Sequence, residues 1–186
     1  MNEVNAESPR RKARLAGLFY ALDIVTGALS LFFAGRGLGT LGDASNLVAT
    51  VCYVAVVVLF FQLFQPVDGT LSLIAACIGG VGCAFGVLAI FDISPGGISP
   101  LVFFGTYCIL IGYLIVGSTY LPPVFGVMMM IGGLGWLTFL SPALAGQLKP
   151  WNMLLGVIAE TALTVWLLAK GVSPERWRAQ ASARSP

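Results

Sequence analysis

The sequence predicts an all-α integral membrane bundle of six transmembrane helices, with both chain termini in the cytoplasm. Its 186 residues are 58% hydrophobic and only 10% charged, whereas a soluble domain carries about 25% charged residues. Apolar runs recur along the chain at about 20 residues each, which is the length needed to cross a hydrocarbon core of about 30 Å. Lysine and arginine gather near the two ends of the chain.

Six segments have the length and composition of membrane-spanning helices. They are residues 15–35, 44–65, 70–91, 99–118, 122–141 and 151–170. Short breaks rich in glycine, proline or charge separate them, namely GRGLGTLGD, QPVDG, DISPGGIS, STYLPP and SPALAGQLKP. Because a backbone in lipid must satisfy its hydrogen bonds internally, these runs are expected to be helices and not isolated strands.

The positions of the basic residues predict the orientation of the bundle. Four precede the first span and four lie from Lys170 onward, whereas only Arg36 and Lys149 lie on the opposite side. Cytoplasmic segments carry the excess of lysine and arginine, so both termini are expected inside the cell, in its (inner) membrane. We expect a disordered cytoplasmic arm over residues 1–12, a membrane domain over 13–172, and a basic cytoplasmic tail over 173–186. The tail lies either in water or on anionic headgroups.

The residue types present narrow the chemistry. The chain has no histidine, which removes the commonest metal ligand and the usual general base. Its four cysteines lie in apolar segments without CxxC spacing and are interpreted as small buried apolar residues. We therefore expect no metal and no cofactor. The basic residues lie at the ends, so no nucleic-acid partner is expected. The expected partners are the lipid bilayer, a second copy of the chain, and a small molecule or ion of unknown identity.

Two acids lie inside predicted spans, where an unpaired charge is costly. Asp23, in the stretch FYALDIVTG, and Glu160 each lie about 12–14 Å from the inner end of their helices at a rise of 1.5 Å per residue. Both are therefore expected near the membrane midplane. No lysine or arginine is expected at that depth. Desolvation and mutual repulsion both favour the neutral acid, so at least one carboxyl should hold a proton at neutral pH.

Helical spacing places each acid on a stripe of small and polar residues. One stripe contains Ala16, Tyr20, Asp23, Thr26, Gly27 and Ser30, and the other contains Asn152, Gly156, Glu160 and Thr164. Such stripes normally face the interior of a bundle. We predict a binding site formed by Asp23 and Glu160 with Thr26, Thr164 and Tyr53. The competing interpretation is that the acids are neutral hydrogen-bonding groups between helices, and that the tyrosine only packs.

Three stretches resemble a family of bacterial integral membrane proteins catalogued as domain of unknown function 4386. They are FQLFQPVDGTLSLIAA at 61–76, LVFFGTYCILIGYLIVGSTYLPPVFGVMMMIGGLGWL at 101–137, and GVIAETALTVWLLAKGV at 156–172. In the family's last span a glutamate matching Glu160 recurs, whereas the first span does not call for an acid at Asp23. Where the family commonly has asparagine after PV, this chain has Asp68. The resemblance covers about residues 12–172 and implies six membrane helices and no established activity.

Three hypotheses of function follow from the sequence. The first is a small multi-pass membrane protein whose protonatable interior site binds or moves a proton, a cation or a small hydrophobic molecule. The second is a membrane-embedded enzyme that modifies a lipid or isoprenoid, with Glu160 as the candidate catalytic general acid. The third is a structural or accessory membrane subunit without activity of its own. The absence of histidine makes the enzyme the less favoured hypothesis.

Overall fold

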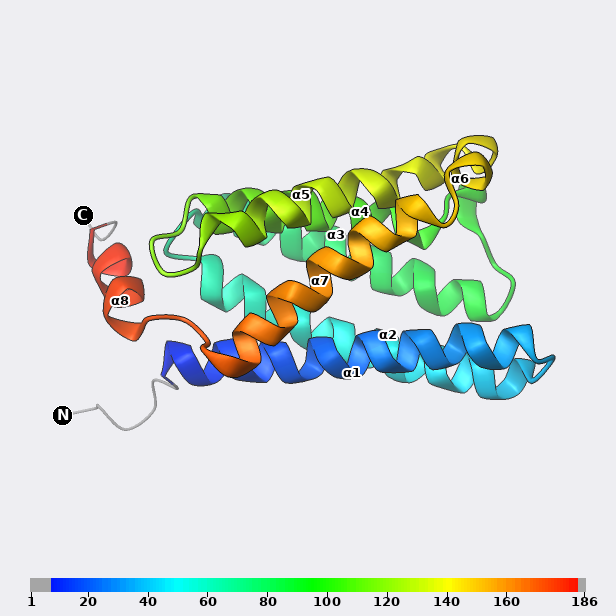
Figure 1. Ribbon diagram of the computed structural model, residues 1–186, viewed down its shortest axis with the longest axis horizontal. Helices are drawn as coiled ribbons and strands as arrows, with labels where there is room; N and C mark the ends of the chain where they lie inside the picture. The colour runs from blue at the N-terminus through cyan, green and yellow to red at the C-terminus, as the bar shows by residue number, and fades with distance from the viewer. Residues whose placement is uncertain (1–7, 184–186) are drawn as a thin grey trace.

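Six long helices among residues 8–183 form a closed ring in which neighbours run in opposite directions (Figure 1). The structure is a computed structural model that describes residues 8–183, and the regular structure in that range is helical. The ring contains, in order, α1 (Pro9–Gly35), α2 (Gly39–Phe64), α3 (Gly69–Ile90), α4 (Pro100–Val116), α5 (Pro123–Leu137) and α7 (Trp151–Ala169). Each helix packs against the next, and α7 closes the ring against α1.

Short helices lie at the two ends of the ring. Helix α8 (Pro174–Ser182) lies at the end where α1 begins and α7 ends, here called the terminal end (Figure 1). Helix α6 (Pro142–Leu148) lies at the opposite end, here called the distal end. Two 3₁₀ turns, η1 (Pro95–Gly97) and η2 (Thr138–Leu140), also belong to the distal connections.

Within residues 8–183, five helices are long and apolar enough to cross a membrane, where the sequence predicted six. One of the five is α5 extended through η2, at 18 residues. The sixth long helix, α4, is shorter than predicted. It has 17 residues and spans about 25 Å, whereas the sequence predicted a span over residues 99–118. Its ends explain the difference. The Ser99 side chain caps the start by accepting from the Leu101 N–H, and the helix stops at Gly117.

The helices differ from the predicted spans most at the start of the chain. Helix α1 begins six residues before the predicted span, because Ser8 caps it and Pro9 supplies a helical φ at its first position. Residues 9–12 of the predicted disordered arm are therefore helical, and residues 1–7 lie outside the described part of the chain. Helix α2 begins at Gly39 and not at residue 44, because Gly37 makes a tight turn with a φ of +74°.

The predicted basic tail also contains structure, because residues 174–182 form α8 and dock on the terminal end. The Trp177 indole and the Tyr120 hydroxyl both donate to the Leu63 carbonyl oxygen, each at 2.8 Å. Burial raises the pKa of Tyr120 above its ordinary value, so its hydroxyl keeps the proton that it donates. The Gln180 side chain accepts from the Thr119 N–H and donates to the Gly117 carbonyl. The sequence predicted a basic tail over residues 173–186 but neither this helix nor its contacts.

Glycine brings α4, α5 and α7 into backbone contact. A Cβ added to Gly112 would lie 2.5 Å from the Gly126 carbonyl oxygen, and one added to Gly133 would lie 2.6 Å from that of Gly105. The two glycine pairs are seven residues apart on both helices, so they lie on one face of each. Gly132 of α5 contacts Gly156 of α7. Small residues permit this close approach, as is common between membrane helices.

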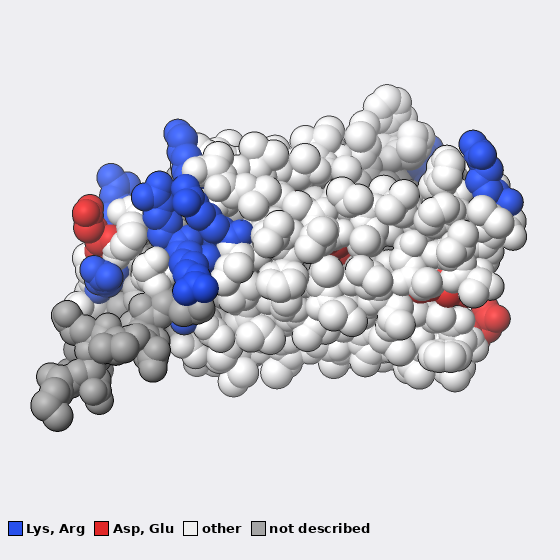
Figure 2. All heavy atoms as spheres, turned by 90° about the horizontal axis from the view of Figure 1, so that it is seen from below, with Lys and Arg blue, Asp and Glu red and all other residues white. Residues whose placement is uncertain are grey.

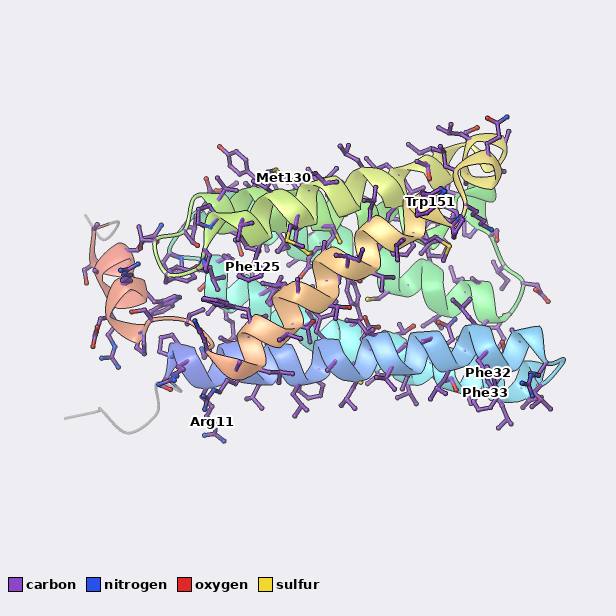
Figure 3. All side chains as sticks on the ribbon, viewed as in Figure 1. Arg11, Phe32, Phe33, Phe125, Met130 and Trp151 are labelled. Atoms are coloured by element: carbon purple, nitrogen blue, oxygen red, sulfur yellow. The ribbon has the colours of Figure 1, made fainter. Side chains whose placement is uncertain are left out.

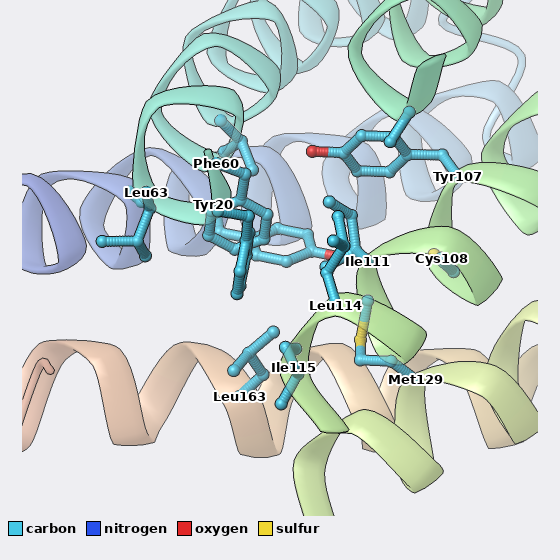
Figure 4. Packing of buried hydrophobic residues seen from close by; sticks show 14 of the residues in the cluster. Tyr20, Phe60, Leu63, Tyr107, Cys108, Ile111, Leu114, Ile115, Met129 and Leu163 are labelled. Atoms are coloured by element: carbon cyan, nitrogen blue, oxygen red, sulfur yellow. The ribbon is translucent and has the colours of Figure 1, made fainter. Parts of the chain in front are cut away.

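Large side chains fill the half of the ring nearest the terminal end. Figure 4 shows part of this packing, with Phe60, Leu63, Leu114 and Ile115 among the labelled residues. Fully buried residues of α2, α4 and α7 meet there, namely Phe60, Leu63, Phe64, Leu114, Ile115, Leu163 and Leu167. The outer surface is also apolar, as exposed residues such as Leu18, Val25 and Leu29 of α1 illustrate. Basic residues gather at the terminal end, with a smaller group at the distal end and a nearly uncharged band between (Figure 2). Arg11 and Trp151 mark the two ends (Figure 3).

Candidate functional site

A cavity of about 380 Å³ lies inside the ring, and all six long helices contribute to its wall. The lining residues are Asp23, Ile24, Gly27, Ala28, Leu31, Asn46, Ala49, Thr50, Tyr53, Gly79, Gly82, Cys83, Gly86, Pro100, Leu101, Phe104, Trp136, Met153, Val157 and Glu160. Several of these, such as Leu31, Pro100 and Met153, lie near the distal ends of their helices. The cavity therefore extends from the middle of the bundle toward the distal end. Its volume is within the usual range of small-molecule sites.

Glu160 lies at the centre of α7, as the tenth of its 19 residues, and is only 5% exposed. Its carboxyl oxygen Oε1 accepts a hydrogen bond of 2.9 Å from Nε1 of Trp136 on α5. An indole N–H can only donate, so the bond suits both the ionised and the neutral carboxyl. The stripe predicted around Glu160 does face the interior, because Asn152, Gly156 and Thr164 are buried as well.

Gly156 makes room for the indole that contacts Glu160. A Cβ at this position would collide with Nε1 of Trp136, so only glycine lets the ring lie across α7 one turn before the carboxyl. The indole is held from its other side by Phe104, at 5.5 Å between ring centroids in an edge-to-face arrangement. The position of the Glu160 side chain thus depends on three helices, α4, α5 and α7.

Asp23 faces the same cavity from α1, the ring neighbour of α7. It is the fifteenth of the 27 residues of α1 and is partly buried. The two acids that the sequence places at matched depth therefore line one cavity. The surroundings of the two carboxyls differ in one contact: the Trp136 indole donates a hydrogen bond to Glu160 and not to Asp23.

No basic side chain shares the depth of these acids. Between Arg14 and Lys170 the sequence contains only Arg36 and Lys149. Both lie in connections at the distal end, directly after α1 and α6. The helices around the cavity thus offer the two carboxyls no lysine or arginine, and the chain has no histidine. The other titratable side chains on the wall are Tyr53 and Cys83.

An aromatic strip completes the wall beside the acids. The rings of Tyr53 and Phe104 lie 4.9 Å apart, and Phe104 continues to Trp136. The Tyr53 hydroxyl is buried and has no hydrogen-bond partner within residues 8–183. Most of the remaining wall is aliphatic or glycine. The cavity is therefore an apolar chamber with one aromatic side and two acidic groups.

Two residues predicted for the site do not line the cavity. The Thr26 hydroxyl donates to the Leu22 carbonyl oxygen of its own helix at 2.7 Å. Thr164 is 4% exposed, and its hydroxyl has no partner in the described part of the chain. Trp136, by contrast, contacts Glu160 and was not predicted. Residue spacing within one helix cannot identify a partner on another, although the small residues IGGLG before Trp136 indicate a closely packed face.

The described residues contain no group of three or more cysteine, aspartate or glutamate side chains placed to hold a metal ion. The four cysteines are free, and Cys77 is exposed, so the prediction that all four are buried is wrong for this one. Cys77 lies on the outer face of α3, one turn after Leu73 and Ile74, which are exposed too.

In the described part of the chain, the fold and the cavity define an all-helical protein with five helices long and apolar enough to span a membrane and an acidic interior cavity. The sequence model of one family, a domain of unknown function (DUF4386), matches residues 96–171. The family resemblance drawn from the sequence is therefore confirmed over this segment. It contains α4, α5 and α7, with Trp136 and Glu160, whereas Asp23 and Tyr53 lie before it. No curated protein and no solved structure matched the chain.

Proposed function

We propose that the protein is a multi-pass membrane protein that binds a small lipophilic cation in the cavity, in exchange for a proton on Asp23 or Glu160. The carrying observation is that two acids from neighbouring helices line one apolar cavity without a basic residue at their depth. A carboxylate in such surroundings needs a counter-charge, which a proton or a bound cation supplies.

The wall favours an organic cation over a bare metal ion. Tyr53, Phe104 and Trp136 present aromatic rings to the cavity, and a cation over such a ring gains about 0.5–2 kcal/mol. The glycines and aliphatic side chains around them match an apolar body better than a hydrated ion. A ligand of matching chemistry has an apolar part and one ammonium group.

The membrane placement rests on the apolar helices and the charge distribution. In this proposal all six long helices cross the inner membrane, with α4 spanning it despite its 17 residues, because a short span can thin the bilayer locally. The excess of lysine and arginine at the terminal end favours a cytoplasmic location for both termini. Protease protection of a tag at each terminus in inverted and right-side-out vesicles tests this orientation.

Binding of benzyltrimethylammonium, measured by calorimetry on protein in uncharged detergent, tests the function. We expect Glu160→Gln to weaken binding at least tenfold, because the amide keeps the acceptor for Trp136 but removes the negative charge. Asp23→Asn should also weaken it. The control is Asp43→Asn, which removes an exposed acid at the distal start of α2 and should change nothing. Equal affinity in wild type and both cavity variants would exclude the proposal.

One chain builds the whole cavity, so the proposed binding needs no second copy. Homo-oligomer formation, the structural role and the lipid-modifying activity remain predictions from the sequence. If Glu160→Gln lowered stability before it changed binding, the carboxyl would be a packing group, as the structural hypothesis holds.

A further inference from the structure

A second feature lies at the terminal end, where two cavities meet at Arg10. One, of about 640 Å³, lies between the start of α1, the α4–α5 connection and the α7–α8 linker. The other, of about 440 Å³, lies in the groove between α1 and α7. Arg10 lines both, so the two form one continuous basic region around its side chain, here called the Arg10 region.

The charged side chains that residues 8–183 contribute to the walls of the Arg10 region are basic. They are Arg10, Arg11, Arg14, Lys170 and Arg176, and this part of the chain places no aspartate or glutamate in either wall. Ser8, Ser118, Thr119 and Ser173 add polar groups. Clusters of lysine and arginine next to membrane helices attract anionic lipids, and basic pockets between such helices bind phosphate headgroups.

The lower part of the groove is apolar. Leu15 and Leu18 of α1 and Leu168 of α7 line it directly beneath the arginines, and Leu18 and Leu168 are exposed at 47% and 39%. A soluble anion would leave this leucine surface uncovered, whereas an acyl chain attached to a phosphate would cover it. Along α1 the arginines come first and the leucines follow. A phospholipid at a membrane interface has the matching order, with its charged headgroup followed by its acyl chains.

Specific contacts hold the basic residues in place. Gly171 turns the chain with a φ of +68°, and a Cβ there would lie 3.1 Å from Cγ of Arg10. The Arg14 guanidinium donates to the Ala169 carbonyl oxygen at the end of α7. Lys170 lies over the Trp166 ring, with Nζ 4.4 Å from the centroid. The cations are thus attached to the framework of α1 and α7, and Trp166 also lines the larger cavity.

We infer that the Arg10 region binds the phosphate of an anionic glycerophospholipid, with an acyl chain along Leu15, Leu18 and Leu168. The inference rests on the membrane placement proposed above and is independent of Asp23 and Glu160. The lipid would contact both the start of α1 and the end of α7, the two helices whose contact closes the ring.

Native mass spectrometry of the protein in uncharged detergent tests this inference with three probes. Phosphatidylglycerol is anionic, phosphatidylcholine has the same phosphate and chains with no net charge, and glycerol 3-phosphate is a soluble phosphate without chains. We expect saturable binding of phosphatidylglycerol, at least tenfold weaker binding of phosphatidylcholine, and no saturable binding of glycerol 3-phosphate.

Variants locate the binding. Arg10→Gln with Lys170→Gln should weaken phosphatidylglycerol binding about 25-fold, given the usual effect of two basic residues near an anionic surface. Arg10→Lys with Lys170→Arg keeps both charges and should retain binding within a few-fold. The matched control, Arg36→Gln with Lys149→Gln, removes two charges from the distal end and should bind as wild type does.

Three outcomes would overturn the inference. Binding of glycerol 3-phosphate as tight as that of phosphatidylglycerol would assign the region to a soluble phosphate. Equal binding of the two lipids would remove recognition of negative charge. Equal losses in the Arg10 and Arg36 double variants would show attraction by overall charge instead of a site. None of these depends on the cavity between Asp23 and Glu160, so this inference and the proposed function fail separately.

Discussion

The two halves of the ring use the same six helices but differ in the size of the side chains that face the centre. In the half near the terminal end, the centre is filled by residues such as Phe60, Phe64 and Leu167. In the distal half the same helices present small residues such as Gly27, Ala28 and Gly86, and a cavity of about 380 Å³ remains. Side-chain volume along each helix therefore decides which half is packed and which half can hold a ligand.

The largest expected effect comes from emptying the packed half. Phe64 is fully buried against Phe60 and Tyr120, and truncation of a buried phenylalanine to alanine costs about 3–5 kcal/mol. We expect Phe64→Ala to lower the unfolding midpoint in detergent strongly. Val51→Ala, at a residue 63% exposed on the same helix, is the control and should change little. Comparable losses at both positions would contradict the tight packing of the centre near the terminal end.

The same glycine substitution should have opposite effects at a contact and at the cavity. A Cβ at Gly133 would lie 2.6 Å from the Gly105 carbonyl oxygen, so Gly133→Ala should destabilise the protein by about 1–3 kcal/mol. A Cβ at Gly27 meets no atom within 4 Å, so Gly27→Ala should stabilise it by about 0.4–1 kcal/mol through helix propensity. Unfolding of both variants in one detergent measures the two changes in stability. Changes of the same sign would contradict the prediction.

Protons should compete with the cation for the acids of the cavity. Benzyltrimethylammonium needs an ionised carboxylate, whereas acid converts Asp23 and Glu160 to neutral groups that attract it less. The measured affinity should therefore rise with pH, and binding in weakly buffered solution should release up to one proton per cation. Glu160→Gln should reduce both effects. An affinity independent of pH, with no proton release, would contradict the exchange.

The smallest expected effect concerns the attachment of α8. Trp177→Phe removes one of two donors to the Leu63 carbonyl and leaves Tyr120 as the other, so the loss should be about 0.5–1.5 kcal/mol. The α7–α8 linker should be cut faster by protease, while cation binding in the distal cavity stays at the wild-type level. A loss of cation affinity in this variant would mean that the two halves are coupled.

The sequence predicted the main elements because apolar length and charge placement are local properties of the chain. The predicted spans 70–91 and 151–170 lie within one residue of α3 and α7. The errors arose where a local signal was overruled or missed. The Ser8 cap carries α1 back to Pro9, and the helix of residues 174–182 is stabilised by contacts with the α4–α5 connection and α2. The contacts of residues 174–182 join positions 61 and 114 apart, so only the Ser173 cap and Pro174 marked this helix locally.

The candidate site was predictable in part for the same reason. Asp23 and Glu160 stood out because acids are rare in apolar spans, and helical rise gave their depths without a structure. The closure of α7 against α1 and the contact of Trp136 with Glu160 could not be predicted, because both depend on helix order around the ring. Gly156 illustrates the limit. Its spacing marked it as part of a small-residue stripe, but not as the space for an indole.

The most direct test of the proposed function is a pair of ligands that differ only in charge. Benzyltrimethylammonium and neopentylbenzene have the same shape, with nitrogen in one replaced by carbon in the other. Competition binding to the purified protein should show a preference of at least tenfold for the cation, and the double variant Asp23→Asn, Glu160→Gln should lose that preference while still binding the hydrocarbon. Equal affinity of the wild-type protein for both ligands would contradict the proposal that the cavity acids select a cation.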